Sequence, residues 1–263
     1  MKTHAVYQVS ILSALMQGIM GGVMTAQELL SHGDFGLGTF EGLGGELIIL
    51  DGEAYRCTAD GCVSPAAPSD QISFAQITFF DAFSPLHMTE KISSFEQLKQ
   101  FLRQWTAEDP NIIYVVKGHT EDADVTVRSM EQQKRPYPTL EEAAHSQKEH
   151  RGSHVSGTLI GFLFPQFMDG VNISSWHIHF LSDDRTQGGH LLSLKSESLH
   201  LQMYPIYEHT LRLPEGTSFA RLAAEKTIGC IKKNRRITKK PVQKHRTGSL
   251  PVTSLQYPQE KHG

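Results

Sequence analysis

One stretch of the sequence decides both the fold of the second half and its chemistry: Trp176-His-Ile-His-Phe-Leu-Ser-Asp-Asp-Arg-Thr-Gln-Gly-Gly-His190. Alternate residues of a β-strand point to the same face, so a strand that begins at Trp176 places His177 and His179 side by side. Residues 182–189 are mostly turn formers, and a hairpin there returns His190 on the neighbouring strand, opposite the pair. The pattern therefore predicts three imidazoles that converge from two rigid strands.

Three converging imidazoles are a typical ligand set for a divalent metal. Neutral histidines bind zinc and other first-row divalent ions, and three protein ligands leave coordination positions for water or a substrate. A His-x-His pair is also common by chance, and many strand histidines lie at the surface or are hydrogen-bonded in a core. The spacing alone leaves two interpretations open: a metal site at His177, His179 and His190, or a structural cluster.

Strand signals continue on both sides of this stretch. Residues 158–164, 199–204 and 209–213 are predicted to be further short strands separated by turn residues, which favours an antiparallel sheet that closes on itself. Earlier in the chain, the apolar run 47–50 leads into Asp51-Gly52, a dipeptide that strongly favours a hairpin turn. Most of the chain is therefore expected to be β-structure.

Helices are predicted to be few and short. Apolar residues at helical spacing indicate a helix over residues 9–20 that ends at Gly21-Gly22, and Thr25 is a suitable N-cap for a second helix that ends near Leu30. The expected fold class is α+β and β-dominated, with a mixed N-terminal sheet and short helices. An antiparallel, barrel-like C-terminal half then carries the metal site.

Charge divides the chain into two parts. Residues 1–220 contain 14 basic and 26 acidic residues, a net charge of −12, whereas residues 221–263 contain 11 basic and 2 acidic residues, a net charge of +9. We expect residues 1–215 to form the catalytic unit, either whole or as two β-rich subdomains that divide near 130–150. Residues 216–263 have little periodic apolar pattern and are predicted to be a basic, disordered tail.

Several signals favour a reducing, cytoplasmic location. No run approaches the roughly 20 apolar residues that a membrane-spanning helix needs. The first ten residues lack the apolar core and cleavage site of a signal peptide. Cys57, Cys62 and Cys230 form an odd and sparse set, which is typical of unpaired thiols. We therefore expect no membrane partner.

Separated blocks of the sequence carry a family resemblance. Besides residues 177–190, they are Gly33-Asp-Phe-Gly-Leu-Gly-Thr-Phe40, Gly45-Glu-Leu-Ile-Ile-Leu-Asp-Gly-Glu53 and Gly157-Thr-Leu-Ile-Gly-Phe162. In this order, over about residues 7–214, they resemble bacterial alpha-acetolactate decarboxylases. The resemblance implies a carbon–carbon lyase that converts (S)-2-acetolactate to acetoin in acetoin and 2,3-butanediol formation, and it suggests a homodimer.

The same resemblance implies the site residues. It assigns zinc to His177, His179 and His190, and catalytic roles to Glu46, to Thr39 and to the Arg of Thr126-Val-Arg128-Ser129. These residue types suit the chemistry, because loss of carbon dioxide from a β-keto acid leaves an enediolate. A Lewis acid polarises the keto and hydroxyl oxygens and stabilises that charge, while a fixed cation orients the carboxylate. No organic cofactor is needed.

The end of the chain departs from the family. Family members usually end in a short acidic tail whose Glu reaches the metal pocket, whereas this chain has the basic run 232–240 and nothing that aligns after Glu215. We therefore carry no tail Glu over.

Two other classes fit parts of the sequence. A cupin-type metalloenzyme also presents His-x-His on a barrel strand, with Asp183 or Asp184 as a carboxylate ligand, but it does not account for the glycine-rich blocks before residue 60. A non-enzymatic protein could bind nucleic acid or an anionic membrane through the basic tail. Both rank below the decarboxylase, so we expect a small-molecule substrate and no nucleic-acid partner.

Overall fold

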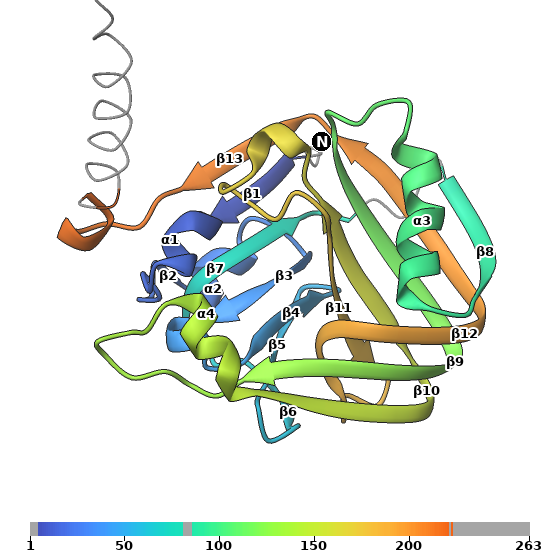
Figure 1. Ribbon diagram of the computed structural model, residues 1–263, viewed down its shortest axis with the longest axis horizontal. Helices are drawn as coiled ribbons and strands as arrows, with labels where there is room; N and C mark the ends of the chain where they lie inside the picture. Colours follow the sequence, from blue (N-terminus) through green and yellow to red (C-terminus); the bar gives the residue numbers. More distant parts are fainter. Residues whose placement is uncertain (1–4, 81–85, 221, 223–263) are drawn as a thin grey trace, which may run out of the picture. The chain divides into compact units, whose positions relative to one another are not determined.

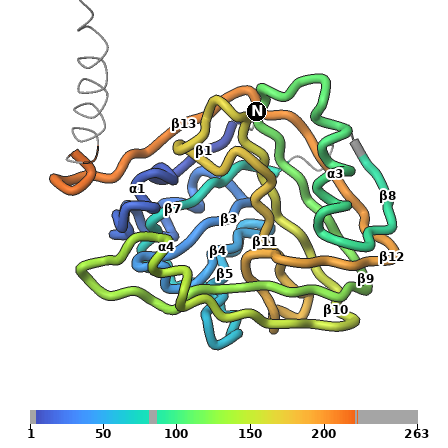
Figure 2. Tube along the Cα trace, in the orientation of Figure 1, coloured from blue at the N-terminus to red at the C-terminus, as the bar shows by residue number. Residues whose placement is uncertain are grey.

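The computed structural model describes residues 5–80, 86–220 and 222, and most of them lie in two β-sheets (Figures 1 and 2). The first sheet has the order β13-β1-β7-β3-β4-β5-β6, with β2 on β7. Its neighbours are antiparallel except β1 and β13, which run parallel. Its strands are β1 (Ala5–Val9), β2 (Met24–Thr25), β3 (Phe35–Phe40), β4 (Glu46–Leu50), β5 (Glu53–Cys57), β6 (Val63–Pro65), β7 (Gln71–Thr78) and β13 (Glu208–Arg212).

The second sheet is antiparallel and closes on itself. Its order is β11-β10-β9-β12-β8, and an additional pairing of β11 with β12 joins four of the strands into a ring. Its strands are β8 (Leu86–Ile92), β9 (Ile113–Met130), β10 (Gln147–Leu163), β11 (Trp176–Ser182) and β12 (Gly188–Ile206). The predicted α+β, β-dominated fold is confirmed, with a mixed N-terminal sheet and a barrel-like C-terminal half.

The two sheets do not divide at residues 130–150. That segment connects β9 to β10, which are neighbours in one sheet over most of their length, and the first sheet instead gives way to the second between Thr78 and Leu86. Segment 130–150 looks like a boundary because its polar residues interrupt the strand pattern. The chain through Leu222 belongs to one compact unit. Of the predicted tail 216–263, residues 221 and 223–263 lie outside the described residues.

The helices are short, as expected, although one begins later than predicted. The helix α1 (Leu12–Met16) has five residues, because Val9 belongs to β1 and pairs with both β7 and β13. Helix α2 (Ala26–Leu30) is capped by Thr25, whose hydroxyl accepts a hydrogen bond from Glu28 N at 3.1 Å. The remaining helices are α3 (Phe95–Thr106), α4 (Leu140–Ala143) and the 3₁₀ turns η1 (Glu41–Leu43), η2 (Ala144–Ser146) and η3 (Gln166–Met168).

A buried apolar core lies between the two sheets. Alternate residues of β4 belong to different cores: Ile48 and Leu50 pack in this inter-sheet core, whereas Leu47 and Ile49 pack in a cluster with α2. Glu46 has the same parity as Ile48, so the alternation directs it toward the second sheet. The inter-sheet core comprises Val6, Phe35, Leu37, Ile48, Leu50, Tyr55, Cys57, Ile113, Val115, Ile160, Phe162, Phe164, Leu181, Tyr204 and Ile206.

The described residues bear on two expectations: that no helix spans a membrane and that the cysteines are unpaired. None of the described helices is long and apolar enough to span a membrane. Cys57 is buried and Cys62 is exposed, and both thiols are free, as predicted. Cys230 lies outside the described part of the chain.

Candidate metal centre

The alternation of β11 directs its two histidines toward the first sheet. Ile178 and Phe180 pack in the interior of the ring of strands, while Leu181 belongs to the inter-sheet core. His177 and His179 have the parity of Leu181 and therefore face β4 and β7. His190 is the cross-strand partner of His179. The predicted hairpin forms, and it brings the three imidazoles together.

The three rings are arranged as a ligand set. His177 Nε2 lies 3.1 Å from His179 Nε2 and 3.1 Å from His190 Nδ1. Nitrogen ligands of a tetrahedral zinc ion, each about 2.05 Å from the metal, lie about 3.3 Å apart. His179 Nδ1 donates a hydrogen bond to the carbonyl oxygen of Leu47 at 3.0 Å. This bond fixes the tautomer of His179 and leaves Nε2 available as a ligand.

Burial keeps all three imidazoles neutral. Loss of solvation lowers the pKa of His177, and the charge of Arg128 lowers it further. Burial also lowers the pKa values of His179 and His190 well below the usual range, with a further contribution from His177. Since a metal binds the neutral imidazole, protonation does not compete with a metal near neutral pH.

The donor set suits a divalent first-row ion. Among the described residues, His177, His179 and His190 are the only group of three or more His, Cys, Asp or Glu residues whose ligand atoms all lie within 4.8 Å of one another. Three neutral nitrogen donors on rigid strands match open sites of zinc and similar ions. The cluster can therefore hold a metal.

Arg128 and Glu46 lie beside the histidines. Arg128 is the cross-strand partner of His190, and its side chain is 19% exposed. Its Nη1 lies 3.7 Å from Glu46 Oε1, and this nitrogen is buried without a hydrogen-bond partner. A partly buried guanidinium with an unused donor is suited to an anionic ligand.

The surroundings of Glu46 favour a protonated carboxyl. Glu46 Oε2 lies 3.5 Å from His179 Nε2, and the side chain is 12% exposed. Burial raises the pKa of Glu46 to about 7, although the charge of Arg128 opposes that rise. A cation bound by the three imidazoles would favour the ionised form. Glu46 is therefore a group that can hold or release a proton near neutral pH.

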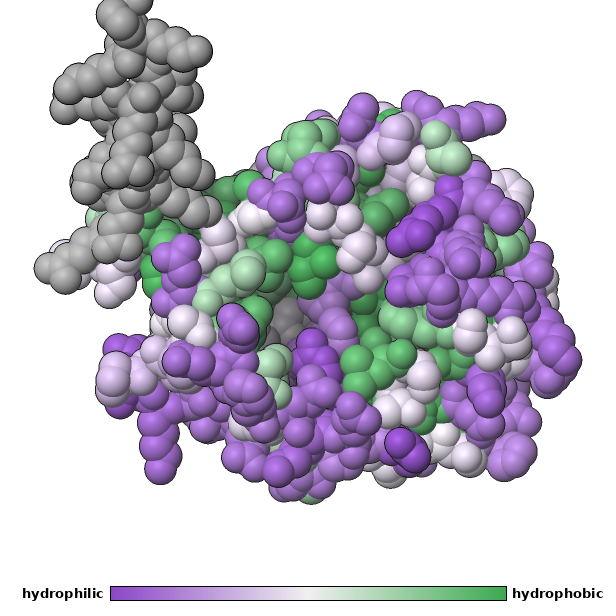
Figure 3. Space-filling view, in the orientation of Figure 1, coloured by the Kyte–Doolittle hydropathy of each residue, from purple (hydrophilic) through white to green (hydrophobic). Residues whose placement is uncertain are grey.

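Thr39 lies on β3 opposite Glu46, and its hydroxyl donates a hydrogen bond to the carbonyl oxygen of Gly45 at 2.9 Å. Thr39 also lines a cavity of about 80 Å³ together with Glu46, Arg128, His177 and His190. Figure 3 shows a hollow near the middle of this face of the molecule, with hydrophobic residues on its margins. The structure thus places Thr39, Glu46 and Arg128 beside the histidine cluster.

Sequence reasoning missed the apolar wall of this cavity. The wall comes from α1, η1, α4, the two sheets and the loop before β11, and it comprises Leu12, Leu15, Leu43, Phe74, Met130, Leu140 and Ile173. Several of these residues pack in one cluster with Met20 and Ala143. The only local signal was the apolar side of two very short helices, which does not reveal what that side covers. The cavity thus combines polar lining residues, among them His177 and His190, with a larger number of apolar ones.

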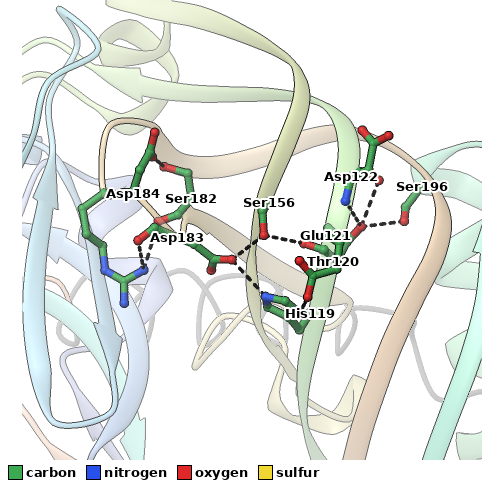
Figure 4. Close-up of polar contacts among 10 residues, drawn as sticks. His119, Thr120, Glu121, Asp122, Ser156, Ser182, Asp183, Asp184 and Ser196 are labelled. Atoms are coloured by element: carbon green, nitrogen blue, oxygen red, sulfur yellow. Dashed lines mark hydrogen bonds and ion pairs between the residues drawn. The ribbon is translucent and has the colours of Figure 1, made fainter.

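The two aspartates considered as cupin-type ligands are engaged elsewhere. Asp183 accepts a hydrogen bond from Ser156 and lies 3.0 Å from His119 Nε2. Figure 4 shows both contacts as dashed lines. Asp184 accepts hydrogen bonds from Ser182 and from Thr186 within the turn. The Asp184 carboxylate caps the β11–β12 turn through Thr186 N, because turn backbone N–H groups need acceptors, whereas the Asp183 carboxylate contacts residues of β9 and β10. The cupin-type carboxylate ligand is therefore wrong.

Comparisons with known proteins point to one family. The family model for alpha-acetolactate decarboxylase matches residues 6–225. Curated relatives named alpha-acetolactate decarboxylase include one from Methanosarcina mazei, 38% identical over 74% of this chain and 67% of the relative. Another, from Methylococcus capsulatus, is 35% identical over 82% of each chain.

Solved structures give the same result. The crystal structure of alpha-acetolactate decarboxylase from Bacillus subtilis strain 168 has a TM-score of 0.77 and 31% identity, covering 82% of this chain and 91% of the other. A Staphylococcus aureus protein described as similar to alpha-acetolactate decarboxylase also has a TM-score of 0.77, at 26% identity. The fold, the converging site residues and these similarities agree: the chain belongs to the alpha-acetolactate decarboxylase family of carbon–carbon lyases.

Proposed function

We propose that the protein decarboxylates (S)-2-acetolactate to acetoin with a zinc ion held by His177, His179 and His190. One observation carries the proposal: Arg128, whose Nη1 is buried without a hydrogen-bond partner, lines the same small cavity as His177 and His190, two of the three clustered imidazoles. A 2-hydroxy-3-oxo acid has a carboxylate, which the guanidinium can bind. It also has a hydroxyl and a keto oxygen, which can chelate a metal held by the imidazoles. Zinc suits the donor set, and other first-row divalent ions are alternatives.

The reaction breaks the bond between C2 and the carboxylate and sends its electron pair toward the ketone. When bound, the metal supplies Lewis acidity to the keto and hydroxyl oxygens and so stabilises the enediolate charge. Arg128 binds the carboxylate and holds the bond between C2 and the carboxylate perpendicular to the plane of the ketone. In this orientation the breaking bond overlaps with the carbonyl π system. Carbon dioxide then leaves, and C2 takes up a proton.

We assign that proton to Glu46 and not to Arg128. A guanidinium has too high a pKa to be an effective acid, whereas a carboxyl group can give up a proton and regain one from water. Glu46 lies between Arg128 and His179, with contacts of 3.7 and 3.5 Å, so it is close to the position that the carboxylate vacates. Thr39, on the neighbouring strand, helps shape the same side of the cavity.

The apolar wall opposite the histidines suits the methyl groups of the substrate. It also reduces access of water to C2, which favours protonation by Glu46 over uncontrolled protonation by solvent. A cavity of about 80 Å³ favours a small substrate. The fold therefore combines a polar reaction side with an apolar side that fits two small alkyl groups.

We propose a homodimer in the cytoplasm that contributes to acetoin and 2,3-butanediol formation, with residues 1–215 as the catalytic unit.

A chain shortened after Glu215 should retain turnover if the basic tail is dispensable. Wild-type affinity for DNA at several salt concentrations tests the alternative role of the tail, because a phosphate-binding tail gives a strong salt dependence that disappears on deletion.

The decisive test is acetoin release. Protein loaded with zinc should convert racemic 2-acetolactate to acetoin in a colorimetric assay and should lose that activity with a chelator. Protein with His190→Ala, prepared in the same way, is the control for metal that binds elsewhere. Turnover that is equal in chelated, His190→Ala and zinc-loaded protein would contradict the proposal.

A further inference from the structure

The glutamine Gln76 is a fully buried polar residue that the reaction itself does not use. It lies on β7 between Ala75 and Ile77, which pack in the cluster on the far face of the first sheet. The alternation therefore directs Gln76 toward the second sheet. Its amide nitrogen lies 3.3 Å from His177 Nδ1, and its amide oxygen is buried without a hydrogen-bond partner.

The metal-bound state requires a particular tautomer of His177. His177 Nε2 is the nitrogen that faces the other two imidazoles, at 3.1 Å from each. A metal ligand must present a lone pair, so with a metal at Nε2 the proton of the neutral ring is on Nδ1. That N–H group then needs an acceptor, since a buried donor without one costs about 1–3 kcal/mol.

The amide of Gln76 can meet this need by rotating. A half-turn about its terminal bond exchanges the two ends of the amide and brings the unbonded oxygen to His177 Nδ1. Before metal binding, His177 Nε2 can carry the proton, and the Gln76 nitrogen then donates to Nδ1. Glutamine is therefore a suitable partner for both tautomers, which neither a carboxylate nor an apolar residue is.

We propose that Gln76 is a positioning residue for the metal, accepting the Nδ1–H of His177 through its amide oxygen and so fixing the ring with Nε2 toward the ion. This inference rests on the proposed metal site. Leu47 O has the corresponding role for His179, at 3.0 Å. The two contacts orient both histidines of β11, one through a main-chain carbonyl and one through a side chain from a different strand.

The test measures metal binding directly. Wild type, Gln76→Met and Gln76→Glu are titrated with cobalt, whose visible absorption reports the coordination geometry, and with zinc in competition with a chromogenic chelator. Loss of the acceptor in Gln76→Met should weaken metal affinity by about 10–100-fold. Gln76→Glu restores an acceptor and should bind at least as tightly as wild type. Thr78→Val, which removes a buried hydroxyl without a hydrogen-bond partner from the same strand, is the matched control and should bind like wild type.

A second measurement uses wild type alone and does not depend on whether a variant folds. In zinc-loaded protein labelled with ¹⁵N-histidine, long-range proton–nitrogen spectra should place the His177 proton on Nδ1, with slow exchange. Folded Gln76→Met with wild-type affinity and an unchanged cobalt spectrum would overturn the role of Gln76, as would a His177 proton on Nε2. If wild type itself binds no cobalt or zinc, the metal site fails, and the inference about Gln76 fails with it.

Discussion

Two groups of three histidines occur in the described part of the chain, and only one of them has the properties of a metal site. His87, His119 and His200 line a surface groove of about 280 Å³ on the second sheet. His119 and His200 are cross-strand partners, as are His179 and His190 in the buried group. Strand register therefore brings histidines together in both places.

The difference lies in what each ring contacts. In the surface group, His119 Nε2 lies 3.0 Å from Asp183, His200 Nδ1 lies 2.8 Å from Thr89 Oγ1, and His87 Nδ1 lies 3.4 Å from Gln202 Nε2. These nitrogens point to separate partners, and Figure 4 shows His119 directed to Asp183. In the buried group, three nitrogens point at one another. Convergence and loss of solvation, not proximity in the sheet, make a metal site.

Removing a ligand from the buried group should have the largest effect. His177→Ala or His190→Ala leaves two ligands, and we expect metal content near zero and activity lower by at least about 10³-fold. The matched changes in the surface group, His119→Ala and His200→Ala, should keep metal content and kcat within about twofold. Metal analysis and the acetoin assay measure both. Equal losses in the two groups would mean that the comparison is wrong.

The next largest effect is expected for Arg128, the cation beside the buried group. Arg128→Ala should keep the metal but lower kcat by about 10²-fold, because the carboxylate loses its cation. Arg128→Lys should recover part of that loss, since an ammonium attracts the carboxylate but cannot bind it in the bidentate way. Lys117→Ala, in the surface groove, is the control. Steady-state kinetics with unchanged kcat in Arg128→Ala would exclude Arg128 from the mechanism.

Metal removal should destabilise the protein through the buried group alone. At a free zinc concentration 100 times the Kd, binding should stabilise the folded state by about 2.7 kcal/mol. Urea unfolding with and without zinc measures this difference. It should persist in His119→Ala and vanish in His190→Ala. A zinc-dependent shift of the same size in both variants would place the ion elsewhere.

The hydrogen bonds beside the surface group should contribute to stability without affecting metal affinity. The Ser156 hydroxyl donates a hydrogen bond to Asp183 and also lies 3.2 Å from the carbonyl oxygen of Thr120, an alternative acceptor for the same proton. Ser156→Ala should lower the free energy of unfolding by about 1 kcal/mol. Zinc affinity should stay at the wild-type value, which chelator competition can check. A large change in affinity would show that the turn network controls the ligands on β11 and β12.

The smallest effect concerns pH and an exposed ion pair. The hydrogen bond from Arg135 lowers the pKa of Glu41 below its usual value of 4.5, and the two groups lie 2.6 Å apart. A lowered folded-state pKa gives stability that is present above the unfolded value and is lost as the pH falls through the folded value. Arg135→Ala should therefore cost less than about 1 kcal/mol at pH 7 and nothing at the lowest pH values. Urea midpoints at pH 7 and pH 3 measure the difference.

Local patterns predicted much of the site correctly. Alternation along β11 brings His177 and His179 to one face, and the turn-forming residues return His190 beside them. The Asp51-Gly52 turn forms with positive φ at both residues, 54° and 83°, as a tight hairpin requires. These features depend on residues close in sequence, so the sequence contains enough information to predict them.

Other features depend on which strands meet. The sequence does not place Gln76 beside His177, since the two residues are 101 positions apart and lie on different sheets. The local sequence also favours a helix at Val9, whereas the structure has a strand there. Pairing with β7 and β13 outweighs the local helical spacing.

By itself, the sequence determined the β-rich class, the three histidines that converge and the family. Its blocks also marked Thr39, Glu46 and Arg128, but only as a resemblance to that family. Tertiary structure decided that Arg128 has an unbonded nitrogen facing Glu46, that seven apolar residues enclose the cavity, and that burial keeps three imidazoles neutral. Strand periodicity acts over a few residues and is visible in the sequence. Packing of two sheets acts over the whole chain, and it sets both the solvation and the distances on which the chemistry depends.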